Sequence, residues 1–377
     1  MRYYIIAGEA SGDLHGANLM KELKIADPAA QFRAWGGDMM EEAGAELVKH
    51  YRDLAFMGFT EVIQNLRTIL GNIAFCKKDI NAHKPDVLIL IDYPGFNLRI
   101  AEYAHEQGIR VFYYISPQIW AWKQSRVHKI KKFVERMFVI LPFEKDFYSR
   151  FGMDVDFVGH PLLDSLEQKK VSFSDLEDFR KKFNLSDKKI IALLPGSRKQ
   201  EISVMLPLML SARSSFPDYQ FVIAGAPSLP VEFYNSLTAS SNTPVISGVT
   251  YELVSHASAA LVTSGTATLE TALLGTPEVV CYKGGRISYT IARSLIKVKF
   301  ISLVNLIMDR LVVTELIQDK LNPKNIEAEL KAILDSGKRD KMLEEYKVLV
   351  NKLGGSGASK KTAELMVAYL NESKQRQ

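Results

Sequence analysis

The sequence is poor in cysteine and contains no long hydrophobic run. Its 377 residues include only Cys76 and Cys281, with no Cys-x-x-Cys pair, which disfavours a disulfide framework or a thiolate metal site and favours a reducing compartment. No uninterrupted apolar segment approaches the roughly 18 residues that span a bilayer. The first residues also lack the pattern of a signal peptide. We therefore expect a cytoplasmic protein, soluble or bound at one face of a membrane.

Neither sign of charge dominates. The chain has 48 Lys and Arg against 43 Asp and Glu, and 47% of its residues are hydrophobic, which is typical of a soluble globular protein. The mild basic excess fits anionic substrates or a membrane surface better than DNA, and no nucleic-acid partner is predicted. A chain of this length is expected to form two domains.

Both halves of the chain alternate predicted strands with predicted helices. Several predicted strands are near-continuous apolar runs, as parallel sheets covered on both faces require. We predict an α/β protein with two doubly wound domains, in which ligands bind at the carboxyl ends of the strands. The predicted strands cover residues 2–7, 32–35, 86–92, 110–115, 136–141, 189–194, 220–224, 244–247, 259–263 and 278–282, and predicted helices include 123–137, 325–334, 339–353 and 358–370.

The segment VTSGTATLETALLGTP combines a strand end, a turn and a helix start. The first N–H groups of a helix lack partners and carry the positive end of its dipole, so a diphosphate fits on Ser264, Gly265, Thr266 and Ala267. Glu270 lies one turn further on the same side as Thr266, where a carboxylate can accept hydrogen bonds from a ribose diol. The alternative is an ordinary strand-turn-helix unit in which Ser and Thr only cap the helix. This segment alone does not decide between them.

A second turn compatible with phosphate follows the predicted strand 189–194. It contains Gly196, Ser197 and Arg198, and the planar guanidinium of an arginine matches a diphosphate. Two such turns in one domain favour a nucleotide diphosphate more than either turn does alone.

Candidate catalytic carboxylates follow two strands of the first half. Asp92 ends a strand of Val, Leu and Ile, so partial burial is expected to raise its pKa, as a general base requires. Glu9 and Asp13 lie in the glycine-containing turn after the first strand, where they can meet a sugar or take part in proton transfer. The alternatives are a helix-capping Asp92 and a capped turn with solvated charges.

Apolar side chains at two places predict contact with an acyl chain, a membrane or another part of the chain. The residues from Met57 to Leu70 recur at helical spacing, which also fits packing on the sheet. Trp120 and Trp122 also fit a core position or a contact between domains. These acceptor-binding or membrane-facing candidates are Met57, Phe59, Ile63, Leu66, Ile69, Leu70, Trp120 and Trp122.

No metal or other cofactor is predicted. Asp154 and Asp156 resemble the Asp-x-Asp pair that holds a metal in some sugar-nucleotide enzymes, but they begin a predicted strand instead of ending one over a ligand site. The seven histidines show no close pairing at metal-ligand spacing.

Several segments, taken in order through most of the chain, together resemble the lipid-A-disaccharide synthases. The Trp-Ala-Trp segment is far more specific than a glycine-rich turn. The matching segments are GEASGD at 8–13, MGFTEV at 57–62, DYPGFN at 92–97, SPQIWAWK at 116–123, LPFE at 141–144, VGHPLLD at 158–164, LPGSR at 194–198 and TSGTATLETALLGTP at 263–277.

This resemblance implies a glycosyltransferase of the GT-B type, with two Rossmann-like domains facing across a cleft. It implies a cytoplasmic enzyme, peripheral to the inner membrane, that joins UDP-2,3-diacylglucosamine to 2,3-diacylglucosamine 1-phosphate, releasing UDP and a β-1,6-linked disaccharide. The sequence does not determine the oligomeric state, and a second copy of the chain, forming a homodimer, is one candidate partner. We expect an acceptor-binding and membrane-facing domain over 1–165, a donor-binding domain over 166–353, and a helix in 354–377 that packs back on the first domain.

The resemblance also implies residue roles. It makes Asp92 the candidate base, Glu9 and Asp13 residues of the acceptor or catalytic site, and Arg198, Thr266 and Glu270 nucleotide-binding residues. Asn305 and Glu315 match residues that the family places beside the donor. Three positions depart from the family pattern, since Gly95, Val304 and Met308 stand where relatives commonly have Asp, Pro and Gly.

Two alternatives to the synthase stay open. A UDP-sugar epimerase of similar fold would share the nucleotide site, and a non-catalytic lipid or nucleotide binding protein would bind without turnover.

Overall fold

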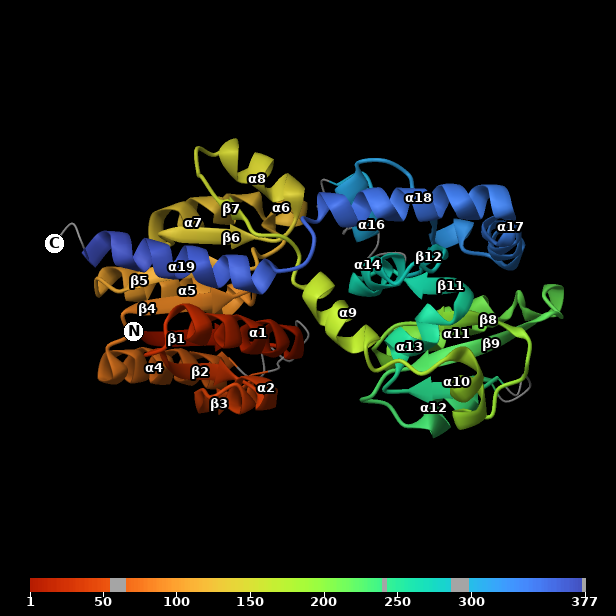
Figure 1. The fold of residues 1–377 in the computed structure, drawn as a ribbon, viewed down its shortest axis with the longest axis horizontal. Coiled ribbons are helices and arrows are strands. Elements are labelled where there is room, and N and C mark those ends of the chain that lie inside the picture. Colours follow the sequence, from red (N-terminus) through yellow and green to blue (C-terminus); the bar gives the residue numbers. More distant parts are fainter. Residues whose placement is uncertain (55–65, 239–242, 286–297, 375–377) are drawn as a thin grey trace. The chain divides into compact units, whose positions relative to one another are not determined.

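The computed structural model describes residues 1–54, 66–238, 243–285 and 298–374, which divide into two compact units (Figure 1). Unit 1 comprises Met1–Asp164 and Leu353–Gln377, and unit 2 comprises Ser165–Lys352. The chain therefore crosses between the units twice, and its last segment belongs to unit 1.

Unit 1 is built on a seven-stranded parallel sheet with the order β3-β2-β1-β4-β5-β6-β7. Its middle strands are almost wholly buried, as their continuous apolar sequences require. The strands are β1 (Arg2–Ala7), β2 (Gln31–Gly36), β3 (Glu46–His50), β4 (Val87–Ile91), β5 (Arg110–Tyr114), β6 (Arg136–Val139) and β7 (Asp156–Phe157).

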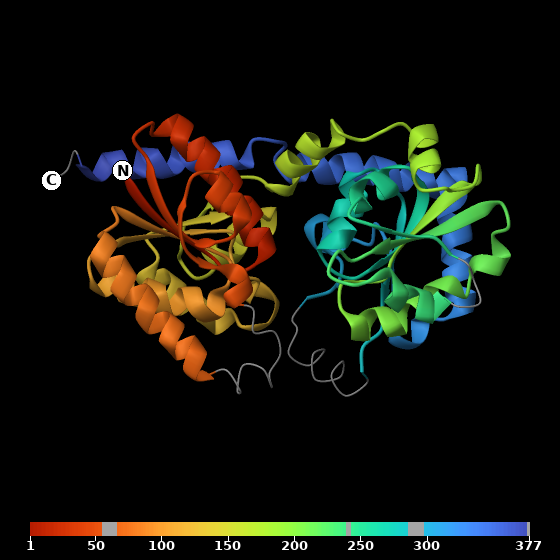
Figure 2. The same cartoon turned by 90° about the horizontal axis from the view of Figure 1, so that it is seen from below.

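Helices cover both faces of this sheet. Helix α1 lies on one side together with α19, which packs against it, and α4 lies on the other side with α5 (Figure 2). The helices of unit 1 are α1 (Ala10–Ala26), α2 (Asp38–Glu42), α4 (Leu66–His83), α5 (Pro94–Glu106), α6 (Ile119–Trp122), α7 (Val127–Phe133), α8 (Pro142–Ser149) and α19 (Ala358–Lys374).

Unit 2 repeats the architecture with a six-stranded parallel sheet in the order β10-β9-β8-β11-β12-β13. Its strands are β8 (Lys189–Leu194), β9 (Tyr219–Gly225), β10 (Val245–Ser247), β11 (Ala257–Thr263), β12 (Glu278–Tyr282) and β13 (Thr314–Ile317). Its helices are α10 (Leu176–Lys182), α11 (Lys199–Leu210), α12 (Val231–Thr238), α13 (Thr250–Ser255), α14 (Thr266–Leu273), α16 (Leu303–Met308), α17 (Pro323–Leu334) and α18 (Ser336–Lys352), while α9 (Leu162–Lys170) begins in unit 1 and ends in unit 2.

The prediction of an α/β protein with two doubly wound parallel sheets is confirmed. The predicted helix 123–137 is wrong, because α7 ends at Phe133 and Val134 is already extended before β6. The apolar residues at helical spacing continue into β6. Pairing of β6 with β5 makes this part of the chain a strand, against its helical pattern. The sequence prediction also omitted β3 and β13, two edge strands whose residues are mostly half-exposed.

Glu278, the first residue of β12, is fully buried. Neither of its carboxyl oxygens has a hydrogen-bond partner among the residues that the structure describes. Burial raises the pKa of Glu278 well above its ordinary value. Burial therefore favours the protonated form of this carboxyl group in the folded protein.

We predict that Glu278→Gln stabilises the protein increasingly as pH rises. In the unfolded chain Glu278 ionises above a pH of about 4.3, whereas the folded chain keeps its proton, so unfolding releases a proton and wild-type stability is lost with rising pH. Glutamine has no proton to release. Above the unfolded pKa and below the folded one, the variant should gain about 1.4 kcal/mol over wild type per pH unit.

Denaturant unfolding at pH 5 and pH 8 measures this difference. Glu177→Gln is the matched control, because Glu177 is an exposed carboxylate of the same unit. A stability difference for Glu278→Gln that does not change with pH would contradict a protonated Glu278.

Candidate active site

The two candidate catalytic turns of unit 1 meet at one edge of its sheet. Strands β1 and β4 are neighbours, with Ala7 opposite Ile91, so the turns that follow them carry Glu9 and Asp92 side by side. Gly8 is buried, and a Cβ atom at this position would overlap the ring of Tyr93. Glycine therefore allows the two turns to approach each other.

Asp92 has the properties of a general base near neutral pH. Its side chain is half-buried, and burial, followed by the negative charge of Glu9, raises its pKa to about 6. A hydrogen bond from the backbone N–H of Tyr93 acts in the opposite direction. The raised pKa that the sequence predicts for Asp92 is thus present in the folded chain.

Asp13 and Glu9 differ in how much of their carboxylates is engaged. Asp13 is buried and accepts hydrogen bonds from the backbone N–H groups of Gly37 (2.7 Å), Met39 (3.2 Å) and Met40 (3.1 Å). It holds the turn between β2 and α2. Glu9 is exposed at the start of α1, where its side chain makes no cap hydrogen bond. Glu9 is therefore better placed than Asp13 to meet a substrate.

Backbone strain gathers at the same edge of the sheet. Asp92, Tyr93 and Ile115 have positive φ angles of 42°, 47° and 65°, a conformation that bulky and β-branched residues rarely adopt. These residues follow β4 and β5, which are neighbours in the sheet. Strain that surrounding structure maintains is common at functional sites.

The two tryptophans after β5 have different environments. Trp120 is buried and packs edge-on against Phe143, with ring centroids 4.9 Å apart. Trp122 is 50% exposed, with the ammonium group of Lys123 at 4.3 Å from its ring centroid. Of the pair, Trp122 is the one available to a membrane or ligand.

Glu144 is a further carboxyl group of this region that the sequence reasoning missed. It is buried at the start of α8, accepts hydrogen bonds from the N–H groups of Leu141 (2.9 Å) and Ile140 (3.3 Å), and burial raises its pKa to about 7. Beside it, the hydroxyl groups of Ser116 and Tyr148 lie 2.7 Å apart. A glutamate at the third position of a helix is the signal that could have identified this capping contact.

The predicted apolar stripe is only partly visible. Met57, Phe59 and Ile63 lie outside the described residues, and Leu66 begins α4 with its side chain undescribed. Of the remaining predicted residues, Ile69 is half-buried and Leu70 is 51% exposed.

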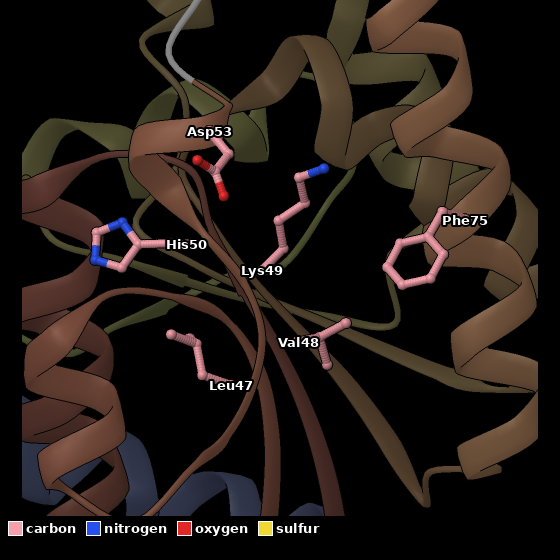
Figure 3. A pocket seen from close by; sticks show the side chains of 6 residues that line it. All are labelled: Leu47, Val48, Lys49, His50, Asp53 and Phe75. Carbon is pink, nitrogen blue, oxygen red and sulfur yellow. The ribbon is translucent and has the colours of Figure 1, made fainter.

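A pocket of about 380 Å³ lies between β3 and α4 (Figure 3). Leu47, Val48, Lys49, His50, Asp53 and Phe75 line it. The ammonium group of Lys49 donates to the side-chain oxygen of Asn72 at 2.8 Å. The sequence reasoning did not single out this pocket.

The two phosphate-compatible turns of unit 2 also meet at one sheet edge. Strands β8 and β11 are neighbours, with Leu194 opposite Val262. Gly196 has a φ of 115°, and a Cβ atom there would overlap the carboxylate of Glu201, which accepts the N–H of Ser197 at 3.2 Å. At Gly265, by contrast, no atom of the described residues lies within 4 Å of an added Cβ. Gly265 and Thr266 are exposed at the start of α14, where an anion can approach.

Glu270 connects this edge to a pocket of about 400 Å³. The carboxylate of Glu270 accepts a hydrogen bond from the hydroxyl of Tyr251 at 2.9 Å, and burial raises its pKa. Tyr251 lines the pocket, and the ammonium group of Lys169 lies 4.6 Å from its ring centroid. The pocket is lined by Lys169, Ser172, Phe173, Pro227, Gly248, Val249, Thr250, Tyr251 and Glu252, a set that the sequence reasoning missed because it joins the ends of several elements.

Asn305 and Glu315 are bonded to each other inside unit 2. The Asn305 amide donates to Glu315 (2.9 Å) and to the carbonyl of Val313 (2.9 Å), and its oxygen accepts the N–H groups of Val312 and Val313. Glu315 in turn accepts the N–H of Ile301 at 3.1 Å. Asn305 is fully buried. It would therefore affect a bound donor substrate only indirectly, through the backbone at Val312 and Val313 that its side chain holds.

Among the described residues, no group of three or more His, Cys, Asp or Glu side chains is placed to hold a metal ion. The same part of the chain contains no helix with the length and apolarity that crossing a membrane requires.

Each unit is a Rossmann-like domain with its polar turns at the carboxyl edge of a parallel sheet, and a pair of such domains is the fold of the GT-B glycosyltransferases and of sugar-nucleotide epimerases. Solved structures share this fold. A putative UDP-N-acetylglucosamine 2-epimerase from Listeria monocytogenes is 13% identical with a TM-score of 0.67, covering 100% of this chain and 97% of its own. The glycotransferase of kitacinnamycin is 13% identical with a TM-score of 0.65, covering 98% and 99%.

The chain belongs to the lipid-A-disaccharide synthetase family, whose profile matches residues 3–368. It is 44% identical to the lipid-A-disaccharide synthase of Syntrophus aciditrophicus, covering 98% of both chains. It is 40% identical to the synthase of Trichlorobacter lovleyi, covering 99% of this chain and 98% of the relative. Sequence thus assigns the family, while the remote structural likenesses show the fold alone.

Proposed function

We propose that this chain transfers the diacylglucosamine of UDP-2,3-diacylglucosamine to the 6-hydroxyl of 2,3-diacylglucosamine 1-phosphate, with inversion. The observation that carries the chemistry is the half-buried Asp92 at the carboxyl end of β4, with its pKa raised to about 6. Family membership over nearly the whole chain supports the choice of substrates.

Asp92 is the general base in this mechanism. A carboxylate with a pKa near 6 is ionised at neutral pH, yet it is a stronger base than an exposed aspartate. It takes the proton of the acceptor 6-hydroxyl while that oxygen bonds to the anomeric carbon of the donor. The attack comes from the face opposite the UDP oxygen, whose bond to this carbon breaks as UDP leaves. Inversion of the α-linked donor therefore gives a β linkage. Glu9 keeps the pKa of Asp92 high through its charge.

Unit 2 binds the donor in this proposal. The diphosphate lies at the turns that contain Arg198 and Thr266. The N–H groups at the start of α14 and the guanidinium of Arg198 stabilise the negative charge that develops on UDP. Among the described residues, no atom lies within 4 Å of a Cβ added at Gly265, which supports this approach. A fixed positive site of this kind replaces a divalent cation.

The pocket at Tyr251 is the proposed site of the uracil ring. It lies at the ends of β9 and β10, beyond the diphosphate turns at β8 and β11, with Glu270 between them to accept the ribose hydroxyls. Its volume of about 400 Å³ is large enough for a pyrimidine ring, and the aromatic side chains of Phe173 and Tyr251 offer faces for it.

The proposal includes a peripheral position at the cytoplasmic face of the inner membrane. Trp122 is half-exposed beside Lys123, and Leu70 and Phe75 are about half-exposed on α4. An aromatic ring with cations beside it suits the lipid headgroup region. Moving a diacyl sugar into water costs about 0.8 kcal/mol per methylene exposed, so catalysis at the bilayer surface is favoured.

The reaction is tested by incubating the purified chain in detergent micelles with both substrates and EDTA. We expect UDP and a tetraacyl disaccharide phosphate, detected by mass spectrometry, because no metal takes part in the mechanism. A C2-epimerised UDP-sugar would instead indicate an epimerase. Absence of both products, with added Mg²⁺ and varied acyl lengths, would reject the synthase proposal.

Tyr251→Phe tests the nucleotide site without the chemistry. The change removes the hydroxyl that orients the Glu270 carboxylate and keeps the ring. UDP should therefore bind about three- to tenfold more weakly, because the proposed acceptor of the ribose hydroxyls is no longer held in place. Titration calorimetry with UDP measures this. Tyr346→Phe is the control, because it removes a buried hydroxyl from α18 of the same unit. Equal UDP affinity in wild type and Tyr251→Phe would place the ribose and base elsewhere.

A further inference from the structure

We propose that Asn97 and Tyr113 are positioning residues, which fix the backbone at Asp92 and so aim its carboxylate. This inference rests on the proposed function, since it presumes that Asp92 is the base. The observation behind it is a set of buried side-chain donors that converge on the main chain at Asp92.

The backbone at Asp92 and Tyr93 requires an external constraint. Two consecutive residues have left-handed conformations, with φ angles of 42° and 47°, and neither is glycine. The side chain of Tyr93, the residue that precedes α5, makes no cap hydrogen bond. An L residue with a side chain of this size persists in that conformation where its surroundings hold it.

Two buried side chains supply that constraint by binding the same carbonyl oxygen. The amide of Asn97 donates to the carbonyl of Asp92 at 2.8 Å and to that of Ile91 at 3.2 Å. The hydroxyl of Tyr113 also donates to the carbonyl of Asp92. Asn97 and Tyr113 are both fully buried, so these donors compete little with water.

A third contact holds the peptide from the other side. The ring of Tyr93 packs against Gly8, where any side chain would overlap it, and stacks on Phe96 with ring centroids 5.7 Å apart. Tyr93 also accepts the N–H of Asn97 at its carbonyl. The Asp92–Tyr93 peptide is thus held both by side-chain hydrogen bonds to the Asp92 carbonyl and by the packing of the Tyr93 ring.

These contacts bind the main chain of Asp92, while its carboxylate accepts the backbone N–H of Tyr93 and keeps further acceptor capacity for another partner. A helix-capping aspartate would show the reverse, with its side chain bonded to the first N–H groups of α5 and no need of strain. Asp13 shows that pattern in this protein, since its carboxylate is occupied by three backbone N–H groups. The contacts at Asp92 therefore orient its side chain. A general base must lie within hydrogen-bond reach of the proton that it removes.

Tyr113→Phe tests the inference, because it removes one donor and keeps the ring. We expect kcat to fall by roughly ten- to a hundredfold, as for a small misplacement of a catalytic group, with the donor KM and the affinity for UDP unchanged. Tyr114→Phe is the matched control, since Tyr114 is the next residue of β5, equally buried and on the opposite face of the sheet. It should retain the wild-type kcat.

The double variant Asp92→Asn with Tyr113→Phe separates positioning from general stability. If Tyr113 acts through Asp92, adding Tyr113→Phe to Asp92→Asn should cause less than about a twofold further loss. Rates are followed over hours with radiolabelled donor, so that the residual turnover of Asp92→Asn is measured. Gly8→Ala, which displaces Tyr93 from the other side, should show the same dependence on Asp92.

Three outcomes would overturn the inference. A wild-type kcat in Tyr113→Phe would remove its basis, and an equal loss in the wild-type and Asp92→Asn backgrounds would indicate a structural role unrelated to the base. Both leave the proposed function intact if Asp92→Asn is severely impaired. If Asp92→Asn itself keeps the wild-type rate, the base is misassigned and the positioning inference fails with it.

Discussion

Replacing Asp92 with asparagine is expected to lower kcat by roughly 10²- to 10⁴-fold, the usual contribution of a general base. Asparagine has nearly the same shape but cannot take the proton of the acceptor hydroxyl. Binding of UDP should not change, because in our proposal the nucleotide contacts only unit 2. Turnover is measured as UDP release and disaccharide formation under saturating concentrations of both substrates.

The pH dependence of the rate provides a second measure of the same residue. The base must be deprotonated, so the wild-type rate should rise with pH and level off above the Asp92 pKa of about 6. The residual rate of Asp92→Asn should not show this rise with pH. Asp86→Asn is the control, because Asp86 precedes the other end of β4 and accepts the N–H of Arg2. An active Asp92→Asn with an unchanged pH profile would refute the assignment.

Replacing Arg198 with alanine should lower kcat by roughly 10²- to 10³-fold, comparable with removing one preorganised donor from a charged transition state. The negative charge on UDP grows as the bond to the anomeric carbon breaks, so the guanidinium stabilises the transition state more than the bound donor. Arg198→Lys should recover only part of the loss, since an ammonium group lacks the planar pair of donors.

Steady-state rates at varied donor concentration test this prediction, because they give kcat and the donor KM separately. Arg310→Ala is the matched control, because it removes another partly exposed arginine of unit 2, one that is paired with Glu345. If Arg198→Ala changed neither kcat nor the donor KM, the leaving group would have to be stabilised elsewhere, and the diphosphate could not lie at the Gly196 turn.

Much of the fold follows from the sequence. The predicted bounds of β1, β8 and β12 coincide with those of the structure, because a strand buried on both faces has an almost uninterrupted apolar sequence that ends where the chain returns to solvent. Edge strands lack that signal. Strand β3 has one exposed and four half-exposed residues, so its sequence is that of many loops.

The sequence also determined which residues belong to the candidate site, through polar residues that directly follow apolar strands. It marked Asp92, Arg198 and Glu270 by residue type and position along the chain. It could not distinguish Glu9 from Asp13, since both are carboxylates of the same turn. Their difference arises because three backbone N–H groups from another turn reach Asp13.

Only the tertiary structure decided which distant residues meet. Strand pairing set Gly8 against Tyr93, and packing placed Tyr251 beside Glu270 and left Glu278 without a hydrogen-bond partner among the described residues. Burial and hydrogen bonding depend on neighbours that are far apart along the chain, and they fix the pKa and the direction of each side chain. Residue type and spacing were therefore enough to locate the chemistry, whereas the positioning of Asp92 by Asn97 and Tyr113 required the folded chain.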